Sequence, residues 1–326
     1  MSAVRVAIIG ASGYTGAELL RLVLGHPKLE LGYAGAREKA GQRLGDVLPG
    51  TEGIAGLGER RLEAFEPGGA QALAERVDVA FTALPHAASA RVCQALLGAG
   101  IRVVDLSADF RLSSADVYEK WYGEHPAKEL ISRAVYGLPE LHRDELRGAR
   151  LIAAPGCYPT SSILPLAPLL SSDLIEHDGL VIDSKSGVSG AGRGAAANTH
   201  FPETSEGMRP YKVAGTHRHV PEIEQELSRV AGASIQVVFT PHLAPFSRGI
   251  LTTAYARAKA GVTVERCREA AESLYRDGLV TVLPAGRLPD TLWVRGSARA
   301  HVAYALDERS NMVVAMCAID NLAKGA

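Results

Sequence analysis

The feature that most constrains this chain is a glycine-rich loop that lies between an apolar run and a helical pattern, close to the first residue. Residues 4–9 are VRVAII, residues 10–16 are GASGYTG, and residues 17–24 are AELLRLVL. A buried strand, a glycine loop and a helix in this order are typical of a dinucleotide-binding fold, because the glycines let the backbone approach a pyrophosphate at the helix N-terminus. The spacing G-x-x-G-x-x-G is less common than G-x-G-x-x-G, so an ordinary tight turn remains an alternative.

The segments that follow extend this unit into a sheet. Residues 29–34, 77–82 and 101–106 have the composition of buried strands, and residues 87–97 have the apolar spacing of a helix. Short connections between alternating strands and helices predict a parallel, doubly wound α/β sheet. Ligands of such sheets bind at the carboxyl ends of the strands.

Polar residues stand where these strands end. Arg37 follows the second strand in place of an acidic residue, Pro85 follows the third, and Ser107 and Arg111 follow the fourth. An arginine at the position of Arg37 can pair with a 2′-phosphate, which favours NADP over NAD, although a solvated surface arginine is the alternative. Arg111 can bind an anionic substrate or pair with a neighbour such as Asp109, and the sequence leaves both roles open.

A cysteine near the middle of the chain stands between a strand and a helix. Residues 151–154 are strand-like, Pro155 and Gly156 form a turn, and an apolar helix runs to about residue 170. Pro159 fits the first turn of that helix, so Cys157 lies beside its N-terminus, where free N–H groups and the helix dipole favour a thiolate. The alternative is a small buried core residue, which is the commoner role of cysteine.

Composition excludes several classes of function. The 326 residues have a formal net charge of −1 and are 47% hydrophobic, which predicts a globular protein of two domains with no basic surface for nucleic acid. No apolar run approaches the roughly 20 residues that span a membrane, and the first residues lead directly into a strand, so we expect no signal or transit peptide and a cytoplasmic location. Four widely spaced cysteines, without a Cys-x-x-Cys pair, argue against a disulfide framework or a thiol-rich zinc site.

The second half of the chain has a different pattern. Residues 180–183, 235–239, 250–256, 301–306 and 312–316 are strand-like. Two helical patterns lie among them, at residues 221–230 and 264–275. This pattern predicts an α+β domain with a mostly antiparallel sheet. The change places a domain boundary near residues 148–149.

Three polar clusters in this half are candidates to meet the cysteine. Residues 184–193, SKSGVSGAGR, can offer several donors to a phosphate or carboxylate, or form a flexible surface turn. His217 and His219 precede a helix, and one of them can hold the proton of a thiol and later donate it. Two structural histidines, or a metal site with Cys157 as third ligand, are the alternatives. Residues 240–249 add another histidine and Arg248.

The motifs of the chain, taken in order, resemble those of the N-acetyl-γ-glutamyl-phosphate reductase family of arginine biosynthesis, within the aspartate-semialdehyde-dehydrogenase-like superfamily. The resemblance covers essentially the whole chain and is most specific at the cysteine and at SGVSGAGR. The segments that carry it are residues 10–16, 105–111, 156–160, 186–193, 217–223, 241–249 and 320–326.

The resemblance implies an NADPH-dependent acyl-phosphate reductase in which Cys157 attacks the acyl phosphate, phosphate leaves, and hydride reduces the resulting thioester to a semialdehyde. His219, with His217 as second choice, is then the acid/base, Glu222 orients the pair, and no metal is expected. The residues expected at the cofactor are Gly10, Ser12, Gly13, Tyr14, Thr15, Gly16, Arg37, Pro85, Ser186, Gly187 and Asn321. Those expected at the substrate are Ser107, Arg111, Ser189, Arg193 and Arg248.

The resemblance also implies a homo-oligomer, a dimer or a tetramer, with a small-molecule substrate. Members of the family continue beyond Lys-Gly-Ala into a further helix that packs on the cofactor domain. We therefore expect residues 1–149 and about 308–326 to form the dinucleotide-binding domain, and residues 150–307 the catalytic domain. The rival functions are a reductase of carrier-linked aminoadipyl or glutamyl phosphate in lysine biosynthesis and a non-catalytic NADP-binding sensor.

Overall fold

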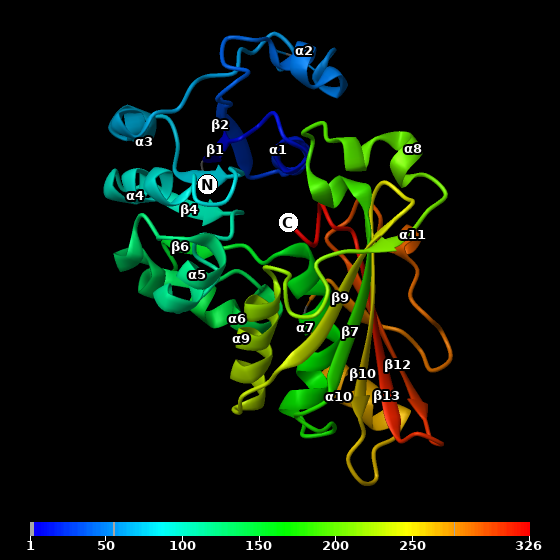
Figure 1. The fold of residues 1–326 in the computed structure, drawn as a ribbon. Coiled ribbons are helices and arrows are strands. Elements are labelled where there is room, and N and C mark those ends of the chain that lie inside the picture. Colours follow the sequence, from blue (N-terminus) through cyan, green and yellow to red (C-terminus); the bar gives the residue numbers. More distant parts are fainter. Residues whose placement is uncertain (1–2, 55, 277) are drawn as a thin grey trace. The chain divides into compact units, whose positions relative to one another are not determined.

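The computed structural model describes residues 3–54, 56–276 and 278–326 (Figure 1). The chain divides into two compact units, residues 1–155 and residues 156–326. The division falls after Pro155, whereas the sequence pattern places it near residue 149.

The first unit is built on a six-stranded sheet in the order β2-β1-β3-β4-β6-β5, and every pair of neighbours in it is parallel. Its strands are β1 (Val4–Ile9), β2 (Leu29–Gly35), β3 (Val79–Thr82), β4 (Arg102–Asp105), β5 (Ala134–Tyr136) and β6 (Leu151–Ala153). Its helices are α1 (Tyr14–Leu24), α2 (Leu44–Val47), α3 (Ala70–Ala74), α4 (Ala90–Gly98), α5 (Ala115–Tyr122) and α6 (Pro139–Leu146), with 3₁₀ turns η1 (Pro49–Thr51), η2 (Pro67–Gly69) and η3 (Lys128–Arg133).

Strand β1 shows why this sheet is covered on both faces. Val6 and Ile8 belong to the core cluster that includes α1, whereas Ala7 and Ile9 belong to the cluster that includes α4. Because successive side chains of a strand point to opposite faces, a strand whose buried residues are apolar on both faces needs a helix layer on each side. The predicted α/β fold with a doubly wound, Rossmann-like first unit is confirmed.

The second unit contains a seven-stranded sheet in the order β11-β12-β13-β10-β7-β9-β8. Its strands are β7 (Leu180–Gly187), β8 (Arg209–Pro210), β9 (Val237–Ala244), β10 (Ile250–Arg257), β11 (Val280–Val282), β12 (Ala300–Asp307) and β13 (Met312–Ile319). Its helices are α7 (Cys157–Ser171), α8 (Phe201–Thr204), α9 (Val220–Ala231), α10 (Val264–Leu274) and α11 (Thr291–Val294), with 3₁₀ turns η4 (Val188–Ala191) and η5 (Ala197–Thr199).

The prediction of a mostly antiparallel sheet is wrong, because this sheet is mixed. β7 pairs with β9 and β11 pairs with β12 in parallel, while the other neighbours are antiparallel. The connection from β7 to β9 contains α9, and a crossover through a helix returns the chain in the same direction. Apolar alternation identifies a strand but carries no direction.

The assignment of residues 308–326 to the first unit is also wrong. β13 lies between β12 and β10 in the seven-stranded sheet, and its whole length pairs with both neighbours. A short turn joins β12 to β13, and two strands joined so closely can only pair as an antiparallel hairpin. The hairpin therefore keeps this segment in the second unit.

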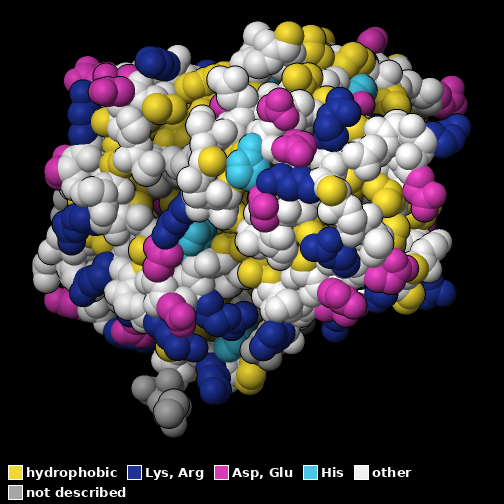
Figure 2. Space-filling view, turned by 90° about the horizontal axis from the view of Figure 1, so that it is seen from below, with side chains coloured by type: hydrophobic (Ala, Val, Ile, Leu, Met, Phe, Trp, Pro, Cys, Tyr) yellow, Lys and Arg dark blue, Asp and Glu magenta, His cyan; other side chains and the backbone are white. Residues whose placement is uncertain are grey.

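Helices α7, α9 and α10 pack against one face of the seven-stranded sheet, as Figure 1 shows. α7 is buried along almost its whole length, although Pro165 and Pro168 lie inside it. Among the described residues, no helix combines the length and apolarity that a membrane span requires. On the face drawn in Figure 2, basic and acidic side chains are intermixed, which agrees with the net charge of −1.

Candidate active site

Cys157 is the first residue of α7, and Gly156 precedes the helix in an extended conformation. The sulfur therefore lies among the N–H groups of the first helical turn, where the helix dipole stabilises negative charge. Cys157 is partly exposed, whereas the other cysteines, Cys93, Cys267 and Cys317, are buried. Burial raises the pKa of each of these three thiols, and that of Cys267 reaches about 11. Of the four cysteines, Cys157 is the one placed as a nucleophile.

A buried carboxylate ties the start of α7 to the start of α9. Glu222, in the first turn of α9, is 1% exposed, and its Oε1 accepts the N–H of Gly156 at 2.8 Å. The charged acceptor strengthens this bond and fixes the residue that precedes Cys157. The orienting role that we expected for Glu222 toward the histidines stays a prediction; the hydrogen bond that the structure shows goes to the turn of the nucleophile.

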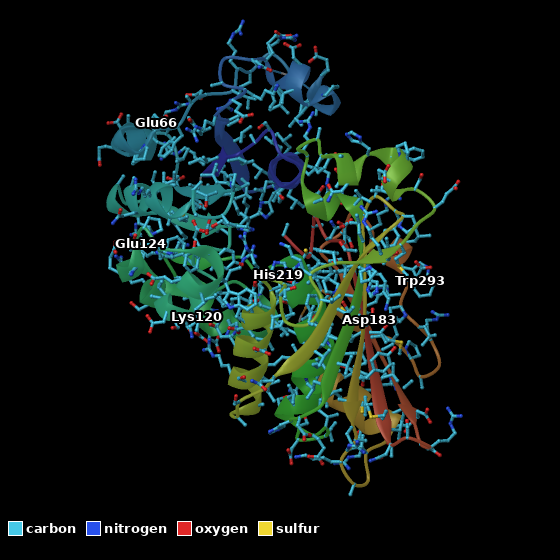
Figure 3. The ribbon with its side chains drawn as sticks, viewed as in Figure 1. Glu66, Lys120, Glu124, Asp183, His219 and Trp293 are labelled. Carbon is cyan, nitrogen blue, oxygen red and sulfur yellow. The ribbon has the colours of Figure 1, made fainter. Side chains whose placement is uncertain are left out.

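The two histidines have different surroundings. His217 is 8% exposed, and its Nδ1 accepts the N–H of His219 at 3.1 Å, so the proton of the neutral ring lies on Nε2. Burial, together with the charge of Lys212, lowers the pKa of His217 to about 4. His219 is only half-buried and stands directly before α9 (Figure 3). Its ring lies 4.8 Å from that of His217 and 6.0 Å from that of Tyr158, the neighbour of Cys157.

An aromatic cluster, which sequence reasoning did not single out, surrounds His217. The rings of Tyr158, Tyr211 and Phe239 lie 5.4–5.6 Å from it. The Tyr211 hydroxyl donates to the Tyr158 hydroxyl, which in turn donates to the backbone oxygen of His242. Tyr158 stands next to Cys157 in the sequence, so this cluster fixes the first turn of α7 from the side of β9. An aromatic residue directly after the cysteine was the only signal of it.

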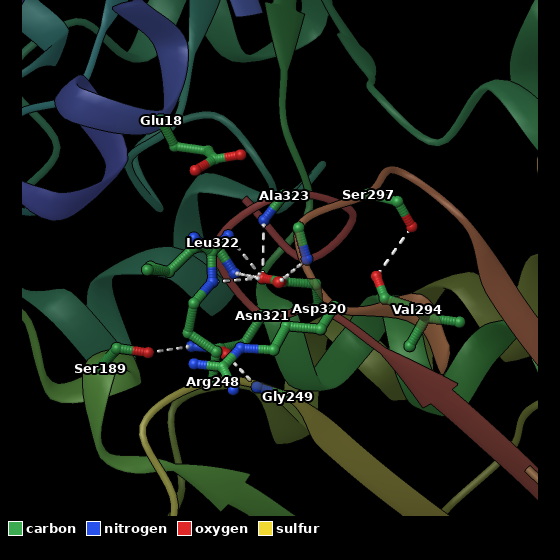
Figure 4. A network of polar contacts seen from close by, with 12 residues as sticks. Glu18, Ser189, Arg248, Gly249, Val294, Ser297, Asp320, Asn321, Leu322 and Ala323 are labelled. Atoms are coloured by element: carbon green, nitrogen blue, oxygen red, sulfur yellow. Dashed lines mark hydrogen bonds and ion pairs between the residues drawn. The ribbon is translucent and has the colours of Figure 1, made fainter. Parts of the chain in front are cut away.

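The anion loop, the segment of residues 184–193 that we predicted to bind a phosphate or carboxylate, begins at the end of β7. Asn321, which follows β13, accepts the N–H of Gly249 at Oδ1 (2.7 Å) and donates from Nδ2 to Ser189 Oγ (3.0 Å), as Figure 4 shows. The first bond fixes which end of the carboxamide carries the donors. Ser186 is buried at the end of β7, and Arg193 is exposed further along the loop. The fold thus brings Ser189 and Asn321 together from distant parts of the sequence.

The C-terminal turn joins this loop to the cysteine. A Cβ built on Gly325 would lie 2.9 Å from the Cβ of Cys157 and 3.0 Å from the Cα of Asn321. Side chains cannot approach so closely, so only glycine fits at this point. The second unit therefore gathers the cysteine, the histidines, Glu222 and the loop around Ser189 and Asn321 in one place.

Arg248 forms an ion pair within the protein, and its predicted substrate contact stays a prediction. Its Nη2 and Nε lie 2.9 and 3.2 Å from Oδ1 of Asp320, a buried carboxylate at the end of β13. Sequence reasoning predicted a substrate contact for Arg248 and did not single out Asp320. Lys212 was also missed; its backbone lies in the left-handed region (φ 46°) and its charge acts on His217.

In the first unit, the glycine loop packs closely against the protein's own backbone. Gly10 has φ +100°, and a Cβ there would lie 2.2 Å from the carbonyl oxygen of Ala83. A Cβ on Gly16 would lie 2.3 Å from the carbonyl oxygen of Gly10. Both positions therefore need glycine, and α1 begins directly in this loop at Tyr14. Ser12 and Gly13 belong to the same turn and Thr15 to the first turn of α1, while Arg37 and Pro85 are exposed beyond β2 and β3.

Arg111 and Ser107 are buried at the carboxyl edge of this sheet. Arg111 donates from Nε to the carbonyl oxygen of Ala154 and from Nη2 to that of Leu106, both at 2.8 Å. Ser107 Oγ donates to Asp105 Oδ2 at 2.6 Å and accepts the N–H of Asp109 at 3.1 Å. Substrate contacts for these two residues stay predictions.

Two buried carboxylates hold this edge together, and of these the sequence analysis named only Asp109, as a possible partner of Arg111. Asp105 accepts from the hydroxyls of Thr82, Ser89 and Ser107, and burial raises its pKa. Asp109 accepts three backbone N–H groups at the start of α4, those of Ala87, Ser89 and Ala90, together with the hydroxyl of Tyr118. The available signal in the sequence was an acidic residue next to a buried strand. Burying a carboxylate is costly unless hydrogen bonds satisfy it, so such a residue is expected to have partners.

A metal site has no support in the described part of the chain, where no three His, Cys, Asp or Glu side chains are grouped as ligands.

Comparisons with known proteins agree with this arrangement. The model of the semialdehyde dehydrogenase NAD binding domain matches residues 5–149, and that of the semialdehyde dehydrogenase dimerisation domain matches residues 157–321. N-acetyl-gamma-glutamyl-phosphate reductase of Syntrophobacter fumaroxidans is 51% identical over 99% of this chain and 92% of its own. The enzyme of the same name from Magnetococcus marinus is 49% identical over 99% of this chain and 91% of its own.

Solved structures share the fold at low sequence identity. Aspartate semialdehyde dehydrogenase II of Vibrio cholerae has a TM-score of 0.72 and 18% identity, and the match covers 100% of this chain and 95% of that one. The family models and the relatives span nearly all of the sequence, including the turn of Cys157 and the histidine pair. The chain therefore belongs to the N-acetyl-gamma-glutamyl-phosphate reductase family of semialdehyde dehydrogenases.

Proposed function

We propose that this protein reduces N-acetyl-γ-glutamyl phosphate to N-acetylglutamate 5-semialdehyde and phosphate with NADPH, as a step of arginine biosynthesis. The observation that carries the proposal is the position of Cys157 at the start of α7. The N–H of the preceding Gly156 donates a hydrogen bond to Glu222 in α9, the helix that begins directly after His219. Full-length identity of 51% to an enzyme named for this reaction supports the choice of substrate.

The first half of the reaction forms a thioester. The Cys157 thiolate attacks the carbonyl carbon of the acyl phosphate, a carbon–sulfur bond forms, and the bond to the phosphate oxygen breaks. The phosphate group leaves with the electron pair of that bond. His219, half-buried and beside Tyr158, takes the proton of the thiol, while neutral His217 holds the backbone of His219 through Nδ1.

The second half reduces the thioester. NADPH, when bound, supplies the hydride that reduces the thioester carbonyl carbon. The carbon–sulfur bond then breaks, the semialdehyde is released, and Cys157 returns as a thiolate. The proton that His219 took from the thiol goes to the phosphate that departs in the first half, so the sulfur leaves unprotonated. Ser189 and Asn321, which are hydrogen-bonded to each other, are the proposed donors to the carbonyl oxygen.

The glycine loop at Gly10 and Gly16 is the proposed pyrophosphate site, because it leads directly into the N-terminus of α1, where backbone N–H groups and the helix dipole favour an anion. Exposed Arg37 is the proposed partner of the 2′-phosphate. Asn321 is the proposed contact to the nicotinamide. The remaining cofactor contacts are proposed at Ser12, Gly13, Tyr14, Thr15, Pro85, Ser186 and Gly187.

The substrate carries a carboxylate and a phosphate, so its proposed ligands are cations and hydroxyls. Arg193 is exposed on the anion loop, and Ser189 lies on the same loop. Arg111 and Ser107 are proposed from the carboxyl edge of the parallel sheet, where each also has partners within the protein.

We also propose that the protein is a cytoplasmic homo-oligomer. The match to a dimerisation domain supports this proposal, and so does the face of the seven-stranded sheet that lies opposite α7, α9 and α10. A row of apolar side chains crosses that face, and its register joins Val238, Val181, Tyr255, Val314 and Ala305.

The experiment that tests the function follows NADPH oxidation with free N-acetylglutamyl phosphate and, in parallel, with carrier-linked aminoadipyl phosphate. We expect turnover of the free substrate only. The Cys157→Ser variant should lose at least about 10³-fold in kcat because a hydroxyl is a much weaker nucleophile. It should still bind NADPH, measured by fluorescence, and Cys267→Ser is the matched control. Turnover of only the carrier-linked substrate, or full activity of Cys157→Ser, would contradict the proposal.

A further inference from the structure

The side chain of Asp320 is fully buried at the end of β13, where it collects backbone N–H groups. Its Oδ2 accepts the N–H of Gly296 at 2.6 Å, and its Oδ1 accepts those of Leu322 and Ala323 at 2.9 and 3.2 Å (Figure 4). These donors come from the loop after α11 and from the C-terminal turn. One carboxylate thus holds two separate segments of the chain.

Arg248 supplies the opposite charge. Its Nη2 and Nε lie 2.9 and 3.2 Å from Oδ1 of Asp320, so both side chains are engaged in one ion pair. Burial alone would raise the pKa of Asp320, but the hydrogen bonds from Arg248 and from the N–H groups of Gly296 and Leu322 outweigh it and hold the pKa below its ordinary value. A buried carboxylate kept ionised in this way needs its cation, because removing either partner leaves an unpaired charge.

The C-terminal turn held by this ion pair touches the reacting groups. Gly325 N–H donates to the backbone oxygen of Asp320 at 3.0 Å, and Gly325 packs against the Cβ of Cys157. Asn321 lies in the same turn, fixed by Gly249 N–H and bonded to Ser189. A shift of the turn would therefore move the carboxamide and the backbone beside the sulfur together.

We propose that Asp320 and Arg248 are positioning residues of the reaction: their ion pair fixes the turn of residues 320–325, and this turn sets the positions of Cys157 and Asn321. Arg248 then acts through Asp320 and is not a ligand of the substrate. The effect on turnover rests on the proposed function, whereas the effect on Cys157 can be measured without any substrate.

The test compares Asp320→Asn, Arg248→Gln and Arg248→Lys. The first measurement is the rate at which iodoacetamide alkylates Cys157 in the folded protein, identified by peptide mapping, since the other cysteines are buried. The second is the pair of constants kcat and KM for the acyl phosphate. We expect Asp320→Asn and Arg248→Gln to slow alkylation at least about fivefold and to lower kcat by roughly 10–100-fold, with KM within about twofold, because small displacements of reacting groups cost this much. Arg248→Lys, which keeps the positive charge, should have an alkylation rate and a kcat between those of Arg248→Gln and the wild type.

Two further variants keep the result decisive. Asp307→Asn makes the same chemical change in the exposed ion pair with Arg309 and should leave both measurements unchanged. Gly325→Ala introduces a methyl group against Cys157 directly and should slow alkylation even if Asp320→Asn does not fold, as judged by circular dichroism.

A raised KM in Arg248→Gln with unchanged alkylation would overturn the proposal and make Arg248 a substrate ligand. Unchanged alkylation in Gly325→Ala would also overturn it. A wild-type protein that is inactive on the acyl phosphate, but shows the expected alkylation pattern, would contradict the proposed function and leave the positioning role supported.

Discussion

At the scale of single residues, the two histidines near Cys157 show what burial does to chemistry. His217 and His219 have the same side chain and lie two positions apart, but the fold buries the first among aromatic rings and leaves the second half-buried. Burial disfavours the charged imidazolium, so the pKa of His217 falls to about 4. A ring that stays neutral at pH 7 and accepts a backbone N–H suits positioning better than proton transfer.

This difference predicts a pH-dependent contribution to stability. The folded-state pKa of His217, about 4, lies below the ordinary value of 6.5, so the unfolded chain takes up the proton first as the pH falls. The stability contributed by neutral His217 is therefore complete above about pH 6.5 and is lost as the pH falls toward 4. We expect wild type to lose roughly 2–3 kcal/mol more than His217→Asn between pH 7 and pH 4.5, measured by urea unfolding.

Asn is chosen because its Oδ1 can accept the N–H of His219 in place of Nδ1. The comparison removes the contributions of all other titrating groups, which both proteins share. Parallel pH profiles for the two proteins would show that His217 is protonated in the folded state at the same pH as in the unfolded chain, against the expectation.

At the scale of elements, α7 is a helix that its own sequence should weaken. Pro165 and Pro168 lie inside it, and a proline removes the N–H that would bond to the carbonyl four residues earlier. Pro168 leaves the carbonyl of Leu164 without its helical donor, and the hydroxyl of Tyr275 donates to that oxygen at 2.7 Å. Nearby, the Tyr304 hydroxyl donates to the carbonyl of Pro165 at 3.1 Å. Side chains from β12 and from the residue directly after α10 thus support the helix that carries Cys157.

Removing one of these hydroxyls should therefore destabilise the protein. In Tyr275→Phe the ring remains, but the carbonyl of Leu164 loses its donor in a buried setting, which costs about 1–3 kcal/mol in the free energy of unfolding. Tyr14→Phe, at an exposed position of α1, is the matched control when both proteins are unfolded without cofactor, and it should change this free energy by less than about 0.5 kcal/mol. Equal urea midpoints for the two variants would show that the hydroxyl of Tyr275 contributes nothing.

At the scale of the whole molecule, the two faces of the seven-stranded sheet are unequal. Helices α7, α9 and α10 pack on one face, and the other carries the row that includes Val238, 57% exposed, and Tyr255, 38% exposed. Contiguous apolar side chains on an exposed sheet face commonly mark an interface between proteins. The proposed occupant is a second copy of this chain, in agreement with the match to a dimerisation domain.

A charge placed in this row should separate the subunits. Tyr255→Arg would bury an unpaired cation between two copies, so we expect the variant to elute as a monomer where the wild type elutes as an oligomer, measured by size-exclusion chromatography with light scattering. Leu24→Arg, at an exposed position of α1 in the other unit, is the control and should keep the wild-type mass. An unchanged mass for Tyr255→Arg would place the interface elsewhere.

The sequence could predict features that depend on neighbouring residues. The glycine loop with its flanking strand and helix, the turn of Cys157 and the helix that follows are local patterns, because side-chain periodicity and turn chemistry act over a few residues. The family resemblance then implied that motifs far apart in the sequence act in one active site. These predictions include the parallel sheet of the first unit and the cysteine at a helix start.

Features that depend on long-range pairing could not be predicted in the same way. Strand direction in the mixed sheet, the place of residues 312–319 in that sheet, and the partner of Arg248 all depend on which distant segments meet. The role of Asp320 could not be predicted for the same reason, since it accepts hydrogen bonds from Arg248, from Gly296 and from the turn that follows it.

The sequence by itself determined the chemistry available to this protein: a thiol at a helix start, two histidines, a bare glycine loop and an anion loop. Only the tertiary structure decided how these groups are used, because burial and opposite charge are properties of the folded surroundings and not of the residue. Burial lowers the pKa of His217, so its ring is neutral at pH 7 and positions the backbone of His219. The fold also places Asp320 where it forms an ion pair with Arg248.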